Sequence, residues 1–429
     1  MSVGLQRLRD EPDVIRRGAR DKGEDAALVD AVLDLDAERR RLLGETDALR
    51  AQRKELSAQV GAQMKAGGGA EADRLRSRSQ EIGAHIDANE ERLRELEGRI
   101  EDLLLRIPNP ADRDVPVGGE EATVTVRSWG EPVPHSAEGW TRRPHWEVAA
   151  DLGLFDLPAG AKVTGSGFPI YRAAGAALQR ALLNFMLDIH VRDHGMTEIW
   201  PPALVNEASA RGTGQIPDKE DQMYVVTRDE LYLVPTAEVP VTNIHRDEII
   251  EAERLPIHYV AYSPCFRREA GAAGAKTRGI LRVHQFDKVE MVAFVRPDDS
   301  SGALEWLTER AEVVLQRLGL AYRVRLMATR DMGFTQAKKY DLEVWAPGVE
   351  EWLEVSSISN FRDYQARRMS IRWRPEAGAK PEILHTLNGS GLALARTVAA
   401  LLEVHQQPDG SVALPEPLVS LIGRRELSA

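Results

Sequence analysis

The stretch AYSPCFRREAGAAGAKTRGILRVHQFDKVEMVAF, residues 261–294, indicates the fold class of this chain. It predicts two β-strands joined by a loop over residues 269–279, in which Gly271, Gly274 and Gly279 supply the backbone freedom that turns need. Successive side chains of a strand point to opposite faces, so the second strand has an apolar face and a mixed one. The apolar face consists of Leu281, Val283, Val289 and Met291, and the mixed face consists of Ile280, Arg282, His284, Phe286, Lys288 and Glu290.

The mixed face has the chemistry to bind a nucleotide. Arginine guanidinium groups bind phosphate, and an aromatic ring such as that of Phe286 can stack on a base. Arg267 and Glu269, which precede the loop, share a face by the same alternation. An exposed antiparallel ribbon with one solvated, charged face fits the alternation equally well. The pattern alone therefore leaves both interpretations open.

The composition is that of a globular protein with a net negative charge. At 429 residues the chain is long enough for two or more domains, and its 43% hydrophobic and 29% charged residues are ordinary values. The formal net charge of -11 argues against coating of nucleic acid by bulk electrostatics. RNA binding through a local cluster of basic residues remains compatible with this charge.

The sequence contains one cysteine, Cys265. A disulfide within the chain and a cysteine-rich zinc site are therefore excluded. Because Cys265 falls in a predicted strand, we expect a buried structural thiol and not a nucleophile. Residues 1–20 are charged throughout, unlike a signal peptide, and no apolar run reaches membrane-spanning length. These features predict a cytoplasmic protein.

Residues 31–107 predict an antiparallel coiled-coil hairpin. In the first helix, leucines recur every seven residues at Leu35, Leu42, Leu49 and Leu56. After a glycine-rich break at residues 66–70, apolar residues follow in steps of three and four or their sums, at Leu75, Ile82, Ile86, Leu93, Leu96, Ile100, Leu103 and Ile107. About thirty residues per helix give an arm of roughly 45 Å. Pro108 and Pro110 end it.

The hairpin has two interpretations, a spacer or dimerisation coil and an arm that contacts RNA. Basic residues give it local positive charge, at Arg39, Arg40, Arg41, Arg50, Arg53, Lys54, Arg74, Arg76 and Arg78. Many of them have acidic neighbours at helical spacing, which is equally typical of a solvated surface of ion pairs. Periodicity alone favours the spacer.

The rest of the chain predicts mixed helices and strands. Helices are expected at residues 173–194 and 301–318, and strands at residues 196–200, 232–245 and within 322–347, with Glu354 in a further strand. The apolar stripe of the first of these helices consists of Leu178, Leu182, Phe185, Ile189 and Arg192. Thr236 and Glu238 share one face of their predicted strand. Residues 385–406 predict a strand, a glycine turn at Gly389 and Gly391, and a helix.

Three motifs together resemble the class II aminoacyl-tRNA synthetases. FRREAG and TRGILRVHQFDKVE, residues 266–271 and 277–290, are similar to their second signature in the version of the seryl-tRNA synthetases. The helix, strand and proline pair up to Pro202 resemble the first signature, which forms the dimer interface in that family. HTLNGSGLALARTV, residues 385–398 with Arg396, resembles the third. The resemblance covers nearly the whole chain.

The resemblance implies an α+β fold with two domains. Residues 1–110 would form a tRNA-binding domain with a helical arm at about 31–107, which in this family grips the long variable arm of the tRNA. Residues 111–429 would form a class II catalytic domain with a mostly antiparallel sheet flanked by helices. On this basis the RNA-binding interpretation of the hairpin replaces the spacer.

The implied activity is a serine–tRNA ligase. L-Serine and ATP would give seryl-adenylate and pyrophosphate, and the seryl group would pass to the 3'-terminal adenosine of tRNA(Ser), with tRNA(Sec) as an open second substrate. The serine carboxylate is already a nucleophile, so catalysis would rest on alignment and charge neutralisation. A homodimer and Mg²⁺ are implied as well, and zinc is not expected.

The resemblance also implies the site residues. Arg267, Arg282 and Arg396 would be catalytic. ATP would contact Arg267, Arg268, Glu269, Val283, Phe286, Glu354, Val355, Ser356, Ser357 and Arg396. Serine would contact Thr236, Ala237, Glu238, Arg267, Glu290, Asn388 and Ser390. Glu354 and Ser357 would ligate the metal, but they fall on opposite faces of a regular strand, so either a bulge or an unusual approach to the metal is needed, and the sequence does not explain which.

Two residues depart from the family pattern and two rival functions remain. Arg268 and Arg330 stand where the family commonly has a serine and a small residue, beside the ligands. One rival is a paralogue that charges a carrier protein or small molecule, although such relatives generally lack the full arm. The other is a coiled-coil scaffold with an inactive catalytic domain, which the presence of Arg267, Glu290 and Arg396 disfavours.

Overall fold

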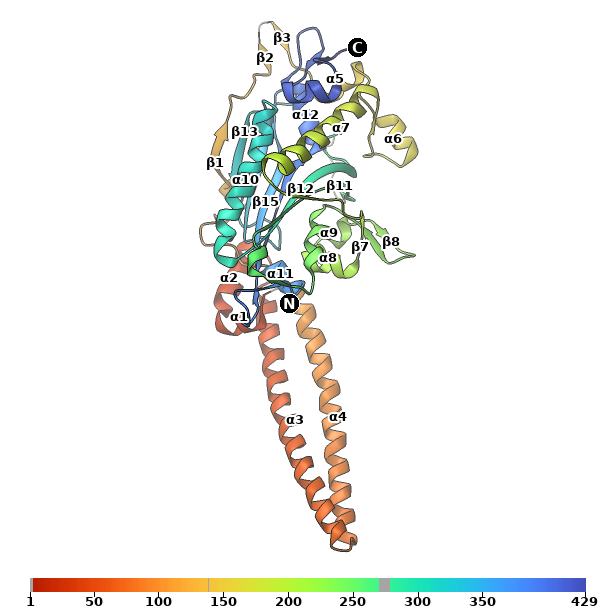
Figure 1. The fold of residues 1–429 in the computed structure, drawn as a ribbon, viewed down its shortest axis with the longest axis vertical. Helices are drawn as coiled ribbons and strands as arrows, with labels where there is room; N and C mark the ends of the chain where they lie inside the picture. Colours follow the sequence, from red (N-terminus) through yellow and green to blue (C-terminus); the bar gives the residue numbers. More distant parts are fainter. Residues whose placement is uncertain (1–2, 138, 270–277) are drawn as a thin grey trace. The chain divides into compact units, whose positions relative to one another are not determined.

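The computed structural model describes residues 3–137, 139–269 and 278–429 (Figure 1). Gly271 and Gly274 of the predicted loop lie outside the described residues. The chain divides into two compact units, Met1–Pro108 and Asn109–Ala429. Among the residues described, no helix is both long enough and apolar enough to cross a membrane.

The first unit consists of two short helices and two long ones. Its helices are α1 (Leu5–Asp10), α2 (Pro12–Lys22), α3 (Ala27–Lys65) and α4 (Ala70–Leu105). The long pair runs antiparallel, since Arg92 binds Glu38 at 3.0 Å and Arg50 binds Glu90 at 2.8 Å (Figure 1). Three glycines with positive φ, Gly67 to Gly69, make the turn between them. The predicted helical hairpin is confirmed.

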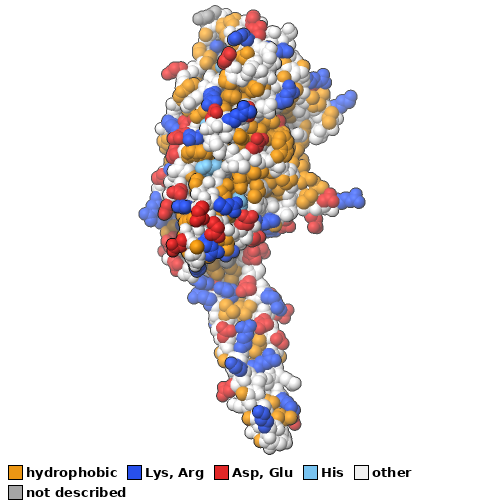
Figure 2. All heavy atoms as spheres, viewed as in Figure 1, with side chains coloured by type: hydrophobic (Ala, Val, Ile, Leu, Met, Phe, Trp, Pro, Cys, Tyr) orange, Lys and Arg blue, Asp and Glu red, His pale blue; other side chains and the backbone are white. Residues whose placement is uncertain are grey.

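The seam of the hairpin is apolar near its base and partly polar further out. Leu35 and Leu42 are buried, whereas Leu49 and Leu56 are only half-buried. The Asn89 side-chain amide donates to the hydroxyl of buried Thr46 at 3.1 Å, which satisfies a polar interruption of the seam. On the visible face of the arm, basic and acidic side chains are interspersed (Figure 2).

An eight-stranded sheet organises the second unit. Its strand order is β1-β13-β14-β15-β18-β12-β11-β6, and only the pair β11–β6 is parallel. The strands are β1 (Val124–Trp129), β13 (Tyr322–Leu326), β14 (Lys338–Ala346), β15 (Glu351–Arg362), β18 (His385–Ala393), β12 (Gln285–Val295), β11 (Ile257–Phe266) and β6 (Thr197–Ile199). The predicted mostly antiparallel sheet is confirmed.

Helices cover both faces of this sheet. Apolar residues of α7 (Ala173–Asp188), α10 (Ser300–Arg317) and α12 (Leu394–Val404) form the main core with the strands. A smaller core involves α9 (Glu238–Thr242), α11 (Tyr364–Arg368) and the opposite side chains of β12. β12 is therefore enclosed, and Glu290 is 0% exposed and Lys288 5%. The interpretation of this strand as an exposed ribbon is wrong.

Shorter elements complete the unit. The remaining helices are α5 (His145–Asp151), α6 (Leu157–Val163), α8 (Glu207–Thr213) and α13 (Glu416–Ile422). The remaining strands are β2 (Ser136–Ala137), β3 (Trp140–Thr141), β4 (Phe155–Asp156), β5 (Ile170–Tyr171), β7 (Leu204–Asn206), β8 (Val225–Val226), β9 (Leu231–Leu233), β10 (Ile249–Glu251), β16 (Arg372–Arg374), β17 (Glu382–Ile383), β19 (Val412–Ala413) and β20 (Glu426–Leu427).

Three local predictions are wrong. The second central strand begins at Gln285 and not at residue 280. Residues 236–242 are not a strand, because the Thr236 hydroxyl accepts a hydrogen bond from the Glu238 amide at 3.2 Å at the start of α9. Arg192 lies exposed in a π-helical turn, Ile189–Asp193, whose extra residue rotates it off the apolar stripe of α7.

The predicted glycine turn near residue 390 is also wrong, because Gly389 and Gly391 lie inside strand β18. Their lack of a side chain still permits a close approach, as expected. A Cβ atom on Gly391 would lie 2.3 Å from Nε2 of the buried His190, which follows α7. That nitrogen is also 2.8 Å from the Gly391 carbonyl oxygen. The side chain of His190, just after α7, therefore packs directly against the backbone of β18 at Gly391.

Candidate active site

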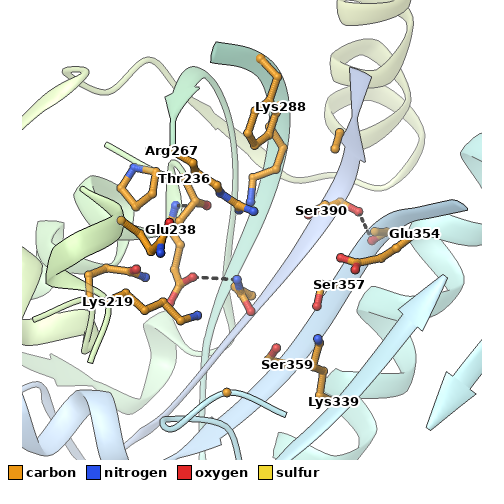
Figure 3. A pocket seen from close by; sticks show the side chains of 18 of the residues that line it. Lys219, Thr236, Glu238, Arg267, Lys288, Lys339, Glu354, Ser357, Ser359 and Ser390 are labelled. Carbon is orange, nitrogen blue, oxygen red and sulfur yellow. Dashed lines mark hydrogen bonds between the residues drawn. The ribbon is translucent and has the colours of Figure 1, made fainter. Parts of the chain in front are cut away.

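A polar cavity of about 530 Å³ lies in the second unit, against strands β12, β14, β15 and β18. Most of the predicted site residues line it, namely Thr236, Glu238, Arg267, Glu269, Arg282, Val283, Phe286, Glu354, Val355, Ser356, Ser357, Asn388, Ser390 and Arg396. Figure 3 shows Glu238 of α9 and Arg267, which follows β11, on one side of the view, and Glu354 and Ser357 of β15 on the other. Residues far apart in sequence thus share one cavity.

Three predicted site residues, Ala237, Arg268 and Glu290, do not line this cavity, and neither does Arg330, which departs from the family pattern. Ala237 and Glu290 are 0% exposed, so Glu290 is sealed behind the wall. The Arg268 side chain instead donates to the carbonyl oxygen of Asp221 at 3.3 Å. Arg330 is exposed, and its amide donates to the Gly118 carbonyl at 2.9 Å.

Two carboxylates meet at one end of the cavity. The side-chain amide nitrogen of Asn388 donates to Glu238 at 2.9 Å and to Glu290 at 2.8 Å. This double donation fixes the amide orientation, since the opposite orientation would set the amide oxygen against both carboxylates. The Asn388 oxygen is buried without a hydrogen-bond partner among the described residues. A ligand with an N–H or O–H group could supply the missing donor.

The two carboxylates differ in charge compensation. The Lys288 ammonium lies 2.6 Å from the second oxygen of Glu290. Glu238 has a neutral neighbour instead, the side-chain amide of Gln365 at 2.7 Å. Burial, followed by the negative charge of Glu290, raises the pKa of Glu238 to about 7. Glu238 is the group at this end that a bound cation would compensate.

The signature around the loop supplies an arginine, a ring and an ion pair. The Arg267 guanidinium lies 5.1 Å from the centre of the Phe286 ring, which is half-buried in the cavity wall. Arg282 and Glu269, at the two ends of the loop, form an ion pair of 2.6 Å. A ligand that binds both Arg282 and Glu269 must therefore exchange this ion pair for its own contacts.

Glu354 and Ser357 both line the cavity because strand β15 contains a bulge. Glu354 pairs with Glu343 and Ser356 pairs with Leu342, so Val355 is the extra residue between two successive partners. The inserted residue reverses the alternation of side chains, which brings Glu354 and Ser357 to the same face. Of the two alternatives that the sequence left open, the structure has the bulge.

Polar contacts fix this side of the cavity. The Ser357 hydroxyl donates to Asp341 at 2.7 Å, and Lys339 lies 3.0 Å from the other oxygen of Asp341. Arg396 donates to the Glu354 carbonyl at 2.9 Å. Burial acts to raise the pKa of Glu354, but the positive charges of Lys339 and Arg396 outweigh it and lower that pKa. Glu354 therefore stays ionised.

Several cavity residues were not predicted from the sequence. They are Lys219, Lys288, Lys339 and Ser359, with Asp341 and Gln365 bound to predicted residues. For Lys288 a signal existed, because it lies two residues before Glu290 on the same strand face. No group of three or more His, Cys, Asp or Glu side chains suited to a metal occurs in the described ranges.

Two families of known proteins match this chain and define the class of protein to which it belongs. Residues 224–405 match the family described as tRNA synthetase class II core domain (G, H, P, S and T). The second unit is thus the catalytic core of a class II aminoacyl-tRNA synthetase. Residues 4–111 match the Seryl-tRNA synthetase N-terminal domain. The chain belongs to the seryl-tRNA synthetase family.

Relatives match along the full length. The chain is 51% identical to the serine–tRNA ligase of Gemmatimonas aurantiaca, with 99% of each chain covered. It is 50% identical to that of Bacillus pumilus, again with 99% of each covered. Among solved structures it is similar to seryl-tRNA synthetase from Pyrococcus horikoshii complexed with ATP, with a TM-score of 0.94, 37% identity and 99% of each chain covered.

Proposed function

We propose that this chain is a serine–tRNA ligase that activates L-serine with ATP and transfers it to the 3'-terminal adenosine of tRNA(Ser). The observation that carries this proposal is the cavity itself, in which a guanidinium group beside an aromatic ring shares the lining with a buried carboxylate, Glu238, that has no ion-pair partner among the described residues. Full-length relatives named serine–tRNA ligase support the same activity. They do not favour the alternative, a paralogue that charges a carrier protein or small molecule.

ATP would bind at the end of the cavity formed by Phe286, Arg267 and Arg396. The Phe286 ring offers a stacking face for adenine, next to backbone groups of Val283. Glu269 would accept from the adenine amino group once its ion pair with Arg282 opens, and the freed Arg282 would join Arg396 in binding the outer phosphates. Arg267 would bind the α-phosphate and the serine carboxylate.

Serine would bind at the other end, among Thr236, Glu238, Asn388 and Ser390. The ionised Glu238 would receive the serine ammonium. The unpartnered oxygen of Asn388 would accept a hydrogen bond from the ligand, and Thr236 and Ser390 are polar groups close by. Glu290 would act through Asn388, to which it is bound at 2.8 Å. An amino acid without a hydroxyl group would leave polar groups here unpaired.

Mg²⁺ fits the oxygen donors of Glu354 and Ser357. Both side chains reach the same face through the bulge at Val355, and a hard cation prefers oxygen ligands. The Ser357 hydroxyl donates its proton to Asp341, so its lone pairs remain available to a cation. When bound with ATP, the ion supplies charge neutralisation to the phosphates.

The residues of the cavity suit adenylate formation without a base. The serine carboxylate oxygen would form a bond to the α-phosphorus while the bond to the pyrophosphate oxygen breaks. No proton moves in this step, so the arginines need only align the two substrates and balance charge. In the second step the oxygen of a ribose hydroxyl of the terminal adenosine would bond to the serine carbonyl carbon while the bond from that carbon to the phosphate oxygen of AMP breaks, and the hydroxyl proton would pass to the departing phosphate.

The helical arm would bind the tRNA. Many of its basic side chains form ion pairs, such as Arg41 with Glu45 and Arg78 with Glu81. Within the described part of the arm, no ion pair engages Arg53, Lys54 or Arg74, so these cations remain available for phosphates. tRNA(Sec) is a second candidate substrate for the same arm.

We place the enzyme in the cytoplasm as a homodimer. The edge strand β6 leads into Trp200, which is 75% exposed in the single chain and packs on Tyr262 at 5.5 Å. A large exposed aromatic ring at a sheet edge suits burial against a second copy.

The first test is ATP–pyrophosphate exchange with each of the twenty amino acids. We expect exchange with serine, and we expect Arg267→Ala to lower it by about 10²–10³-fold, because one charged donor at a developing phosphate charge contributes that much. Arg330→Ala, an exposed arginine outside the cavity, serves as the matched control and should retain exchange. Preference for alanine, or full exchange by Arg267→Ala, would contradict the proposal.

The second test shortens the arm. Because Arg50 lies opposite Glu90 and Arg53 packs on Gly83, residues 50–85 can be replaced by a glycine turn. We expect serine-dependent exchange to persist and kcat/KM for tRNA charging to fall on the order of a hundredfold, through loss of phosphate contacts. Unchanged charging by the shortened protein would show that the outer arm is a spacer.

The third test concerns pH. Glu238 must be ionised to bind the serine ammonium, and its pKa without ligand is about 7. The Kd for serine should therefore be constant above that pH and rise by about tenfold per unit well below it, since binding must then release a proton. Calorimetry in buffers of different ionisation enthalpy would measure both effects. A Kd that stays constant down to about pH 5.5 would contradict the assignment.

A further inference from the structure

Lys288 is the one lysine that contacts a carboxylate at the serine end of the cavity within the described part of the chain. It lines the cavity, and its ammonium lies 2.6 Å from Glu290. The two side chains are 7% and 0% exposed. They lie two residues apart on strand β12 and therefore share a face of the sheet. The pair is almost completely removed from water.

The ion pair of Lys288 and Glu290 matters because it sets the net charge at the serine end of the cavity. Glu238 and Glu290 are both buried and both accept from the same amide nitrogen of Asn388. Two buried negative charges need compensation, because an unpaired buried charge is costly. Lys288 compensates Glu290, whereas the neighbours that donate to Glu238 are neutral amides. One carboxylate is therefore left for the ligand.

Other cations line the cavity, but among the described residues none of them forms an ion pair with Glu238 or Glu290. The Arg267 guanidinium lies over the Phe286 ring at 5.1 Å. Lys219 lies on an exposed segment and lines the cavity, and its positive charge acts to lower the pKa of Glu238, but in the described ranges no ion pair joins it to either carboxylate. Lys339 is bound to Asp341 at 3.0 Å.

We propose that Lys288 determines amino-acid specificity by neutralising Glu290, so that the cavity accepts a substrate with one ammonium and rejects one that carries a second ammonium in place of the hydroxyl. This inference rests on the proposed serine-binding function and adds a residue to it. Lys288 has no bond to make or break in the reaction. Its action is through the charge of Glu290.

The matching probe is 2,3-diaminopropionate, which has an amine where serine has its hydroxyl. In the natural protein a second ammonium would meet Lys288 as a like charge. In Lys288→Met the side chain keeps about the same length and loses its charge, so the buried charge of Glu290 has no cation beside it and favours a cationic group in the adjoining cavity.

The experiment compares kcat/KM for serine and for 2,3-diaminopropionate in ATP–pyrophosphate exchange, with Kd values from calorimetry as a second readout. We expect Lys288→Met to reduce the preference for serine by about ten- to a hundredfold, as close charge pairs at binding sites do. Lys288→Arg should restore the preference. Lys338→Met is the matched control, because Lys338 forms an ion pair of the same length, 2.6 Å with Asp114, and does not line this cavity.

The outcomes separate the two proposals. A purely structural role of Lys288 would lower kcat/KM for both amino acids equally, and an unchanged preference in a folded Lys288→Met protein would overturn the inference. If that variant does not fold, Glu290→Gln decides, since it leaves Lys288 as a surplus cation. It should weaken serine binding and keep the diamine rejected, and improved binding of the diamine would overturn the inference. Absence of serine-dependent exchange in the natural protein would instead refute the proposed function.

Discussion

The burial of charged side chains on one face of an enclosed strand is the constraint on which this structure depends. Lys288 and Glu290 lie in β12, between β11 and β18, where both faces of the sheet are covered. Neither charge could remain there alone, so the neighbouring strands must supply partners at fixed positions. Asn388 of β18 does so for Glu290, and it links the same carboxylate to Glu238 at the start of α9. Strand pairing thus sets the geometry of the amino-acid end of the cavity.

The opposite wall depends on backbone geometry more than on charge. The bulge at Val355 brings Glu354 and Ser357 to one face, and the regular pairing that follows it places Ser356 on the Ser390 carbonyl at 2.6 Å. This hydrogen bond joins β15 to β18 two residues after Asn388, which also lies in β18. The proposed metal ligands on β15 and two of the proposed serine ligands, Asn388 and Ser390 on β18, consequently lie on paired strands.

Much of the fold could be predicted because its signals are local. The spacing of the leucines and three glycines specify the arm. The alternation of apolar and polar side chains predicts the central strands, and the proline pair marks the end of the strand at residues 196–200. Local parity also showed that Glu354 and Ser357 could not share a face of a regular strand, although it did not show that a bulge resolves the conflict. Errors arose where a single contact overrides the pattern. The Thr236 hydroxyl starts a helix where alternation favours a strand, and a π-helical turn moves Arg192 into solvent.

The parts of the site that could not be predicted depend on long-range contacts. The alternation of side chains predicts that Lys288 and Glu290 share a face of their strand. The pair is buried, and its charge balance matters, only because other elements cover both faces of the sheet. In the same way, Asp341 is notable only because β14 places it 2.7 Å from Ser357. Arg282 and Glu269, which the resemblance assigns to nucleotide binding, are paired with each other in this structure. Sequence thus identified the residue types of the site and not their partners.

A crystal structure with serine and a non-hydrolysable ATP analogue would show whether the two substrates lie in the cavity as proposed. We expect adenine on the Phe286 ring, the serine ammonium within hydrogen-bond distance of Glu238, and Lys288 still paired with Glu290. An adenine bound elsewhere, or a serine ammonium far from Glu238 with the cavity filled by both ligands, would contradict the proposed arrangement.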